Sequence, residues 1–90
     1  MIYIIGSLAQ ANDIKKVAES LNTADVKYVK HEANKSFEEC VKQCFDNIEQ
    51  CSELYVVSKN DGSLGQGATY EVEYAKRLDK KITITKPIWN

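Results

Sequence analysis

The sequence predicts an α/β fold of three layers, in which about four parallel strands form one sheet flanked by helices. Three short apolar or β-branched runs end at turn residues, as strands buried on both faces do, and a fourth segment alternates apolar with polar residues. Stretches with helical spacing separate these four segments, which gives the order β-α-β-α-β-α-β. This order builds a parallel sheet with right-handed crossovers, as in flavodoxin-like and Rossmann-like folds.

The first half of the chain contains two of the strands and the helix between them. Residues 2–5, Ile-Tyr-Ile-Ile, form a continuous apolar run that ends at Gly6. Ser7 can cap a helix that ends near Asn22. Residues 26–31 alternate valine and tyrosine with lysine and histidine, which predicts a strand exposed on one face and therefore at an edge of the sheet.

The second half contains the other two strands and two helices. Ser36 begins a helix over residues 36–51, with two glutamates in its first turn, where the helix dipole favours anions. Residues 54–58 are a second apolar run, residues 68–78 are helical, and residues 82–85 are β-branched throughout.

Size and charge limit the classes of function. Ninety residues with 43% apolar content can bury one small core, so we expect a single domain over residues 1–90. Twelve basic and thirteen acidic side chains give a net charge of −1, which argues against binding to a nucleic acid polymer. The apolar N-terminal stretch lacks a basic flank and soon reaches Gln10 and Asp13, so it fits neither a signal peptide nor a membrane span. We expect a cytoplasmic protein that does not bind membranes.

The cysteines are interpreted as part of the core. Cys40, Cys44 and Cys51 lie on one side of a predicted helix. The apolar residues on that side are Phe37, Val41 and Ile48. A metal or redox site is the alternative, but His31 is the only histidine and lies on another element, and no C-x-x-C pair exists. Buried thiols are therefore favoured, and we expect neither a metal nor a cofactor.

A glycine loop precedes the last helix. Gly65 and Gly67 follow a buried strand, where backbone N–H groups and the helix N-terminus can hold an anion. The loop is neither G-x-G-x-x-G nor a P-loop, because Tyr70 and Glu71 occupy the positions that those motifs need. A simple turn and a ligand loop remain equal alternatives on this pattern.

Ligands of parallel sheets bind beyond the carboxyl ends of the strands. In this chain those ends are the segment after the first strand and the loop after the third. The candidate binding residues are Gly6, Ser7, Ser63, Gly65, Gln66 and Gly67. Glu71 follows this loop at the edge of the helix face that meets the sheet, where it could point into a cleft or serve only the helix dipole.

Three segments resemble, in order, those of one known enzyme family. Residues 2–7, I-Y-I-I-G-S, resemble the opening segment IYLAGP, and residues 48–57, I-E-Q-C-S-E-L-Y-V-V, resemble a strand entry written I..aD.viv. Residues 67–75, G-A-T-Y-E-V-E-Y-A, resemble the segment G-T-x-x-E-[IL]-G-Y-A. These segments belong to the nucleoside 2-deoxyribosyltransferase-like family, and the resemblance covers nearly the whole chain.

The resemblance implies specific roles. Glu71 matches the family's nucleophile, which attacks the anomeric carbon of a deoxyribonucleoside and forms a covalent glycosyl-enzyme that another base or water resolves. Tyr3 matches the tyrosine that positions the nucleophile, and a hydrogen bond from its hydroxyl would keep the pKa of the carboxyl low. A structural Tyr3 in the core is the alternative. Asp46 and Asp61 are the nearest candidates for a second acid, although Asp61 in its Asp-Gly pair is more often a turn former.

Three positions depart from the family pattern: Ser7 replaces a proline, Ala68 a threonine and Glu73 a glycine. The leading hypothesis is an N-glycosidic-bond enzyme, either a nucleoside 2-deoxyribosyltransferase or a deoxynucleoside or deoxynucleotide N-hydrolase. The alternatives are a non-catalytic module that binds a nucleotide or nucleotide-sugar, and a small interaction scaffold. The family commonly completes its sites across a subunit interface, so the resemblance implies a homo-oligomer, a dimer or higher. The candidate interface residues are Tyr74, Ile88 and Trp89.

Overall fold

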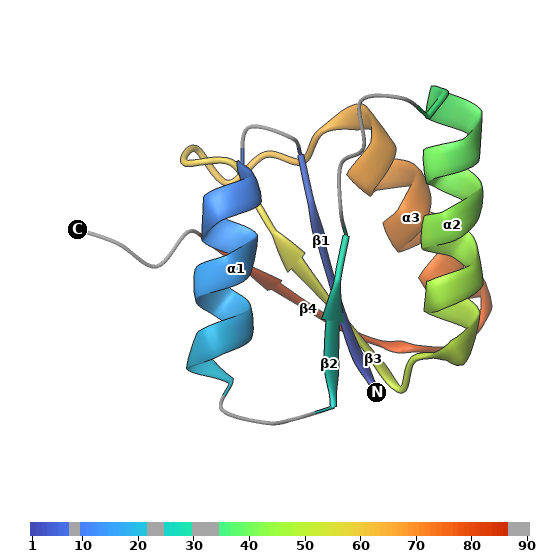
Figure 1. Cartoon of the computed structure of the whole chain (residues 1–90), viewed down its shortest axis with the longest axis horizontal. Helices are drawn as coiled ribbons and strands as arrows, with labels where there is room; N and C mark the ends of the chain where they lie inside the picture. Colours follow the sequence, from blue (N-terminus) through green and yellow to red (C-terminus); the bar gives the residue numbers. More distant parts are fainter. Residues whose placement is uncertain (8–9, 22–24, 30–34, 87–90) are drawn as a thin grey trace.

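The computed structural model describes residues 1–7, 10–21, 25–29 and 35–86. Four strands form one parallel sheet in the order β2-β1-β3-β4 (Figure 1). The strands are β1 (Ile2–Gly6), β2 (Val26–Tyr28), β3 (Glu53–Val57) and β4 (Lys81–Thr85). This arrangement confirms the predicted parallel α/β fold, with β2 at an edge of the sheet as its alternating sequence predicted.

The helices cover both faces of the sheet (Figure 1). One face carries α1 (Ala11–Ser20), and the other carries α2 (Phe37–Gln50) and α3 (Gln66–Arg77). The chain goes from β1 outward to β2 and then crosses back to β3 on the other side of β1. The strand order therefore reverses between β1 and β3, and ligands of such sheets bind beyond the carboxyl ends of the strands at this point.

The ends of two helices test the predicted caps. Ser36 caps α2 as predicted, because its Oγ accepts the Glu39 N–H at 3.2 Å. Ser7 does not cap α1: the helix follows Gln10 and ends at Ser20, and only the backbone carbonyl of Ser7 accepts the Gln10 N–H, at 2.9 Å. The prediction failed because the chain makes a backbone turn before the helix begins. Of the strand predicted over residues 26–31, Lys30 and His31 lie outside the described residues.

The core has one part on each face of the sheet. On the α1 face, Ile4 and Val57 pack with Ile14 and Val17. The cluster on the other face contains Tyr3, Ile5, Cys44, Ile48, Cys51, Leu54, Val56, Ala68, Val72 and Ala75. Cys44 and Cys51 are buried as expected and Cys40 is half-buried, whereas the prediction that Phe37 is a core residue is wrong. Phe37 is 64% exposed, because it is the first residue of α2 and lies near Gly67 instead of over the sheet.

Among the described residues, no helix combines the length with the apolar content that crossing a membrane would require.

Candidate functional site

A cavity of about 290 Å³ lies at the carboxyl ends of β1 and β2, between the N-terminal parts of α2 and α3. It brings together six of the sequence-predicted site residues: Gly6, Ser7, Gly65, Gln66, Gly67 and Glu71. Phe37, Cys40, Val41 and Cys44 of α2, together with Val29, Lys35 and Ala68, complete the lining. The glycine loop therefore faces the same space as the candidate nucleophile.

Two of the glycines serve this site in different ways. A Cβ at Gly6 would lie 3.0 Å from Ile14 Cδ1 and 3.1 Å from the Val57 carbonyl oxygen, so glycine allows close packing where β1 ends. A Cβ at Gly67 would instead lie 4.0 Å from both Glu71 Oε1 and Phe37 Cε2. These are ordinary contact distances, so Gly67 lies beside both the carboxylate and the ring.

Glu71 is a buried carboxyl group. It lies in the second turn of α3 and is only 7% exposed. Burial raises the pKa of Glu71 from its ordinary value of 4.5 to about 7, and a hydrogen bond with the Cys44 thiol opposes this rise. The carboxyl is therefore divided between its neutral and its ionised form near neutral pH, a property common among catalytic acids and nucleophiles.

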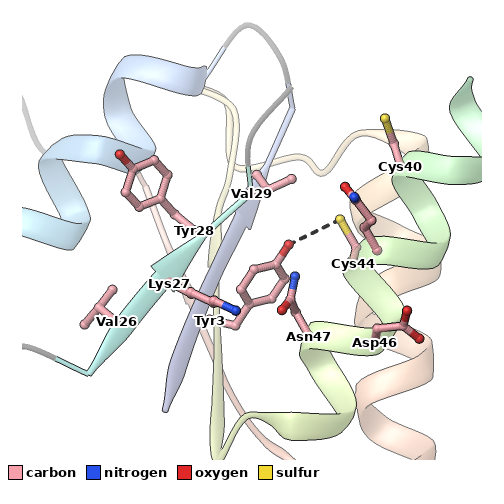
Figure 2. Close-up of a pocket in the computed structure, with 10 residues that line it drawn as sticks. Tyr3, Val26, Lys27, Tyr28, Val29, Cys40, Cys44, Asp46 and Asn47 are labelled. Atoms are coloured by element: carbon pink, nitrogen blue, oxygen red, sulfur yellow. Dashed lines mark hydrogen bonds between the residues drawn. The ribbon is translucent and has the colours of Figure 1, made fainter. Parts of the chain in front are cut away.

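Cys44 connects Glu71 to Tyr3. The Tyr3 hydroxyl donates a hydrogen bond to Cys44 Sγ at 3.4 Å (Figure 2). Burial and the charge of Glu71 raise the pKa of Cys44 to about 12, and burial also raises the pKa of Tyr3. Both groups are therefore neutral at physiological pH, and the thiol keeps its proton for Glu71.

This arrangement corrects two expectations about Tyr3. Its hydroxyl was expected to bond the Glu71 carboxylate directly, but it bonds the thiol that lies between them. The pKa of Glu71 was expected to be held low, but it is raised, because burial outweighs the single hydrogen bond from a weak thiol donor. Tyr3 itself is a core residue, 2% exposed, and it lines a second, larger cavity instead of the cavity of Glu71.

Ser7 presents an unsatisfied polar atom at the cavity. Its Oγ is buried and has no hydrogen-bond partner. Among the described residues, it is the only buried side-chain oxygen or nitrogen of which this is true. A buried hydroxyl without a partner is unfavourable. Because Ser7 also lines the cavity, a polar ligand group placed there would satisfy it.

The second acid that the sequence proposed does not line this cavity. Asp46 lines a different cavity, of about 510 Å³, between β2 and α2, and Figure 2 shows its carboxylate pointing away from Tyr3. This larger cavity shares Val29, Cys40 and Cys44 with the cavity of Glu71. The two spaces are therefore neighbours on either side of the thiols of α2.

Asp61 and Ser63 form a turn instead of a site. Asp61 Oδ1 accepts the Ser63 N–H at 2.9 Å and the Ser63 hydroxyl at 2.7 Å, and these bonds lower the pKa of Asp61. Gly62 between them has a φ of +87°, which favours glycine. Both side chains are exposed and neither lines the cavity, and the hydrogen bonds of Asp61 are those of a turn former.

Tyr74 has partners within its own chain. Its ring stacks on Phe45 at a centroid distance of 4.3 Å, and its hydroxyl donates to Glu49 of α2. These contacts join α2 to α3. Ile88 and Trp89, the other candidate interface residues, lie outside the described residues.

Sequence reasoning missed the roles of α2 at this site. Cys44 was interpreted as a core thiol, and Phe37 as a core ring, yet both line the cavity that holds Glu71. Their spacing of seven residues places them on one side of the helix, and this spacing was the available signal. Lys35, just before α2, also lines the cavity.

In the part of the chain that the structure describes, no three histidine, cysteine or acidic side chains are grouped so that they could hold a metal ion.

The comparisons with known proteins bear on the fold. The sequence matches no known family model and no curated protein. A solved structure, described as a 2-desoxiribosyltransferase from Leishmania mexicana, is similar with a TM-score of 0.71 and 19% sequence identity. The similarity covers 94% of this chain and 63% of that chain, so this chain spans less than two thirds of its structural neighbour. At this identity, the likeness shows a shared fold.

Proposed function

We propose that the protein acts on the N-glycosidic bond of a deoxyribonucleoside or deoxyribonucleotide, with Glu71 as the nucleophile. The observation that carries this proposal is the position of Glu71: a buried carboxyl group in a cavity at the strand ends, beside a glycine loop. The fold shared with a 2-desoxiribosyltransferase supports the same chemistry. We also propose that residues 1–90 act as one deoxyribosyltransferase-like domain.

In the proposed reaction, the ionised Glu71 carboxylate attacks the anomeric carbon of the sugar. A carbon–oxygen bond forms, the carbon–nitrogen bond breaks, and the base leaves with the electron pair of that bond and takes a proton from water. A second base or water then attacks the same carbon and releases Glu71. Because the pKa of Glu71 is about 7, the attacking form becomes more abundant as the pH rises through neutrality.

The remaining groups of the cavity fit a sugar or sugar phosphate. The buried Ser7 hydroxyl can bond a sugar hydroxyl or a phosphate oxygen. Gly65 to Gly67 lie at the start of α3, where backbone N–H groups and the helix dipole favour an anion, and Lys35 adds positive charge to the lining.

A non-catalytic nucleotide-binding module is the second candidate. The observation that favours it is that, among the described residues that line the Glu71 cavity, no second aspartate or glutamate is found. Glycosidic-bond enzymes commonly use two carboxyl groups. A homo-oligomer in which a second copy supplies the missing acid would reconcile this observation with catalysis.

The deciding experiment incubates the wild type and Glu71→Gln with deoxyribonucleosides and their 5′-monophosphates, with and without an acceptor base. Free base is followed by chromatography. Glu73→Gln is the matched control, because Glu73 is an exposed acid on the same helix that pairs with Lys76. Base release or exchange that is lost only in Glu71→Gln supports the enzyme. Thermal stabilisation by nucleotides without turnover in the wild type supports the binding module.

A further inference from the structure

An aromatic side chain lines the cavity that contains Glu71. Phe37 is the first residue of α2, is 64% exposed and lines the same cavity as Glu71. A single exposed phenylalanine is ordinary on a protein surface. Phe37 differs because part of its ring belongs to a cavity wall that also carries a carboxyl group and an unsatisfied hydroxyl.

The distance between this ring and the carboxylate fits a nucleoside. Glu71 Oε1 and Phe37 Cε2 each lie 4.0 Å from the Cβ position of Gly67, so they are at most about 8 Å apart. An anomeric carbon ready for attack lies about 3 to 3.5 Å from the carboxylate oxygen. Because the ring is at most about 8 Å from the carboxylate, a base attached to that carbon can reach the 4.5 to 7 Å centroid separation at which aromatic rings stack.

The cavity lining has a polar part and an apolar part, as a nucleoside has a polar sugar and an aromatic base. Ser7, Gln66 and Lys35 offer polar or charged groups, which suit the sugar and its substituents. Phe37 offers an apolar ring that is largely open to solvent and that the packing of its own chain leaves mostly uncovered. Nothing in the helix requires this residue to be aromatic, since its neighbours in the first turn of α2 are exposed polar side chains.

We infer that Phe37 is the platform on which the base of the substrate stacks, so that the protein recognises the aromatic half of a nucleoside or nucleotide through this ring. The inference rests on the proposed function and deepens it. Recognition through stacking uses the flat face of the base, which the sugar and phosphate do not have.

The test compares a ligand that has a base with one that lacks it. A deoxynucleoside 5′-monophosphate and 2-deoxyribose 5-phosphate are titrated calorimetrically into Phe37→Ala, Phe37→Trp and unchanged Phe37, all in the Glu71→Gln background so that no ligand is consumed. We expect Phe37→Ala to weaken nucleotide binding about five- to a hundredfold, the range found when a stacking ring is truncated, and to leave sugar phosphate binding unchanged. Phe37→Trp should restore nucleotide binding.

Tyr70→Ala is the matched control. Tyr70 is also an exposed aromatic residue, at 54%, but lies on α3 outside the cavity lining. Its truncation should change neither affinity. Thermal unfolding of each variant establishes that the protein is folded.

Each of the following results would overturn the inference. Equal weakening for both ligands would mean that Phe37 only shapes the cavity, and unchanged nucleotide affinity would mean that the base lies elsewhere. Loss of self-association in Phe37→Ala, seen by sedimentation without a change in nucleotide affinity, would assign the ring to an interface between copies of the chain. If Glu71→Gln abolishes wild-type turnover while Phe37→Ala leaves KM and kcat unchanged, the proposed function stands and the inference fails. If no nucleotide binds and none is turned over, both fail.

Discussion

The two faces of the sheet differ in chemistry although they are built from the same strands. The α1 face has an aliphatic cluster, with Ile4, Ile14 and Val57 at its centre. The buried carboxyl of Asp13 at the start of α1 accepts a hydrogen bond from the Gln10 side chain at 2.6 Å. The face toward α2 and α3 buries a phenol, two thiols and the carboxyl of Glu71. Successive side chains of a strand point to opposite faces, so β1 sends Ile4 to one and Tyr3 to the other.

This difference assigns stability and chemistry to separate faces. The aliphatic side chains on the α1 face are buried without a desolvation cost, and the buried Asp13 carboxyl there has Gln10 as a hydrogen-bond partner, whereas Glu71 loses solvation without gaining a strong partner. The cavity lies on the second face, between the N-terminal parts of two helices, and one helix covers the other face. Changes on the α1 face should therefore affect folding, and changes on the α2 and α3 face should affect ligands and pH dependence.

The largest expected effect is on stability and comes from the α1 face. Ile14→Ala removes a fully buried side chain and should lower the free energy of unfolding by about 2 to 5 kcal/mol, because a cavity remains at the end of β1. Urea denaturation measures this change. Nucleotide affinity, measured below the unfolding transition, should stay as in the wild type. Loss of affinity in the folded variant would show that the two faces are coupled.

The next effect is a dependence of stability on pH that comes from the other face. Folding raises the pKa of Glu71 from 4.5 to about 7, so the folded protein keeps a proton that the unfolded chain releases between these values. The Glu71 contribution is therefore fully present below the lower pKa and is lost as the pH rises through the higher one. Glu71→Gln cannot ionise and should gain stability over the wild type, by about 3 kcal/mol, as the pH rises from about 4 to about 8.

Urea denaturation across this pH range measures the difference. Glu73→Gln is the control, because Glu73 is exposed and its replacement should give a difference that changes little with pH. A constant gap between the wild type and Glu71→Gln would contradict the raised pKa.

The sequence predicted the fold better than the contacts of the site. Strand and helix positions follow from local patterns: the run of residues 2–5, for example, can be buried only in a strand covered on both sides. Glu71 and the glycine loop could be placed together because both follow β3. The partner of the Tyr3 hydroxyl could not be predicted, since it depends on how far α2 lies from β1, and this distance is a property of tertiary packing.

The position of Phe37 shows a second limit of prediction from sequence. Its helical spacing from Cys44 assigned it correctly to one side of α2 but not to the core, because periodicity does not say where along a helix the sheet beneath it ends. Asp46 and Asp61 were candidates by nearness in sequence alone, and the structure places them on a different cavity and in a turn.

A smaller effect should come from the hydrogen bond between Cys44 and Glu71. Cys44→Ala removes the thiol that hydrogen bonds the carboxyl, so the pKa of Glu71 should rise above about 7. Cys44→Ser replaces the thiol with a stronger donor, so the pKa should fall below the wild-type value, each change being roughly one unit or less. A carbon-13 NMR titration of the Glu71 carboxyl, assigned with Glu71→Gln, measures both. If the two variants titrate alike, Cys44 does not act on Glu71 through a hydrogen bond.

The smallest effect should come from the turn that the sequence offered as a source of the second acid. Asp61→Ala removes the carboxylate that accepts two hydrogen bonds from Ser63, so it should loosen an exposed turn and lower the Tm slightly. Because Asp61 does not line the cavity, kcat and KM should equal those of the wild type. A large fall in kcat with little change in Tm would contradict this, because it would mean that the turn closes over the cavity when substrate is bound and brings Asp61 to the leaving base. The same measurement thus decides whether Asp61 supplies the second acid.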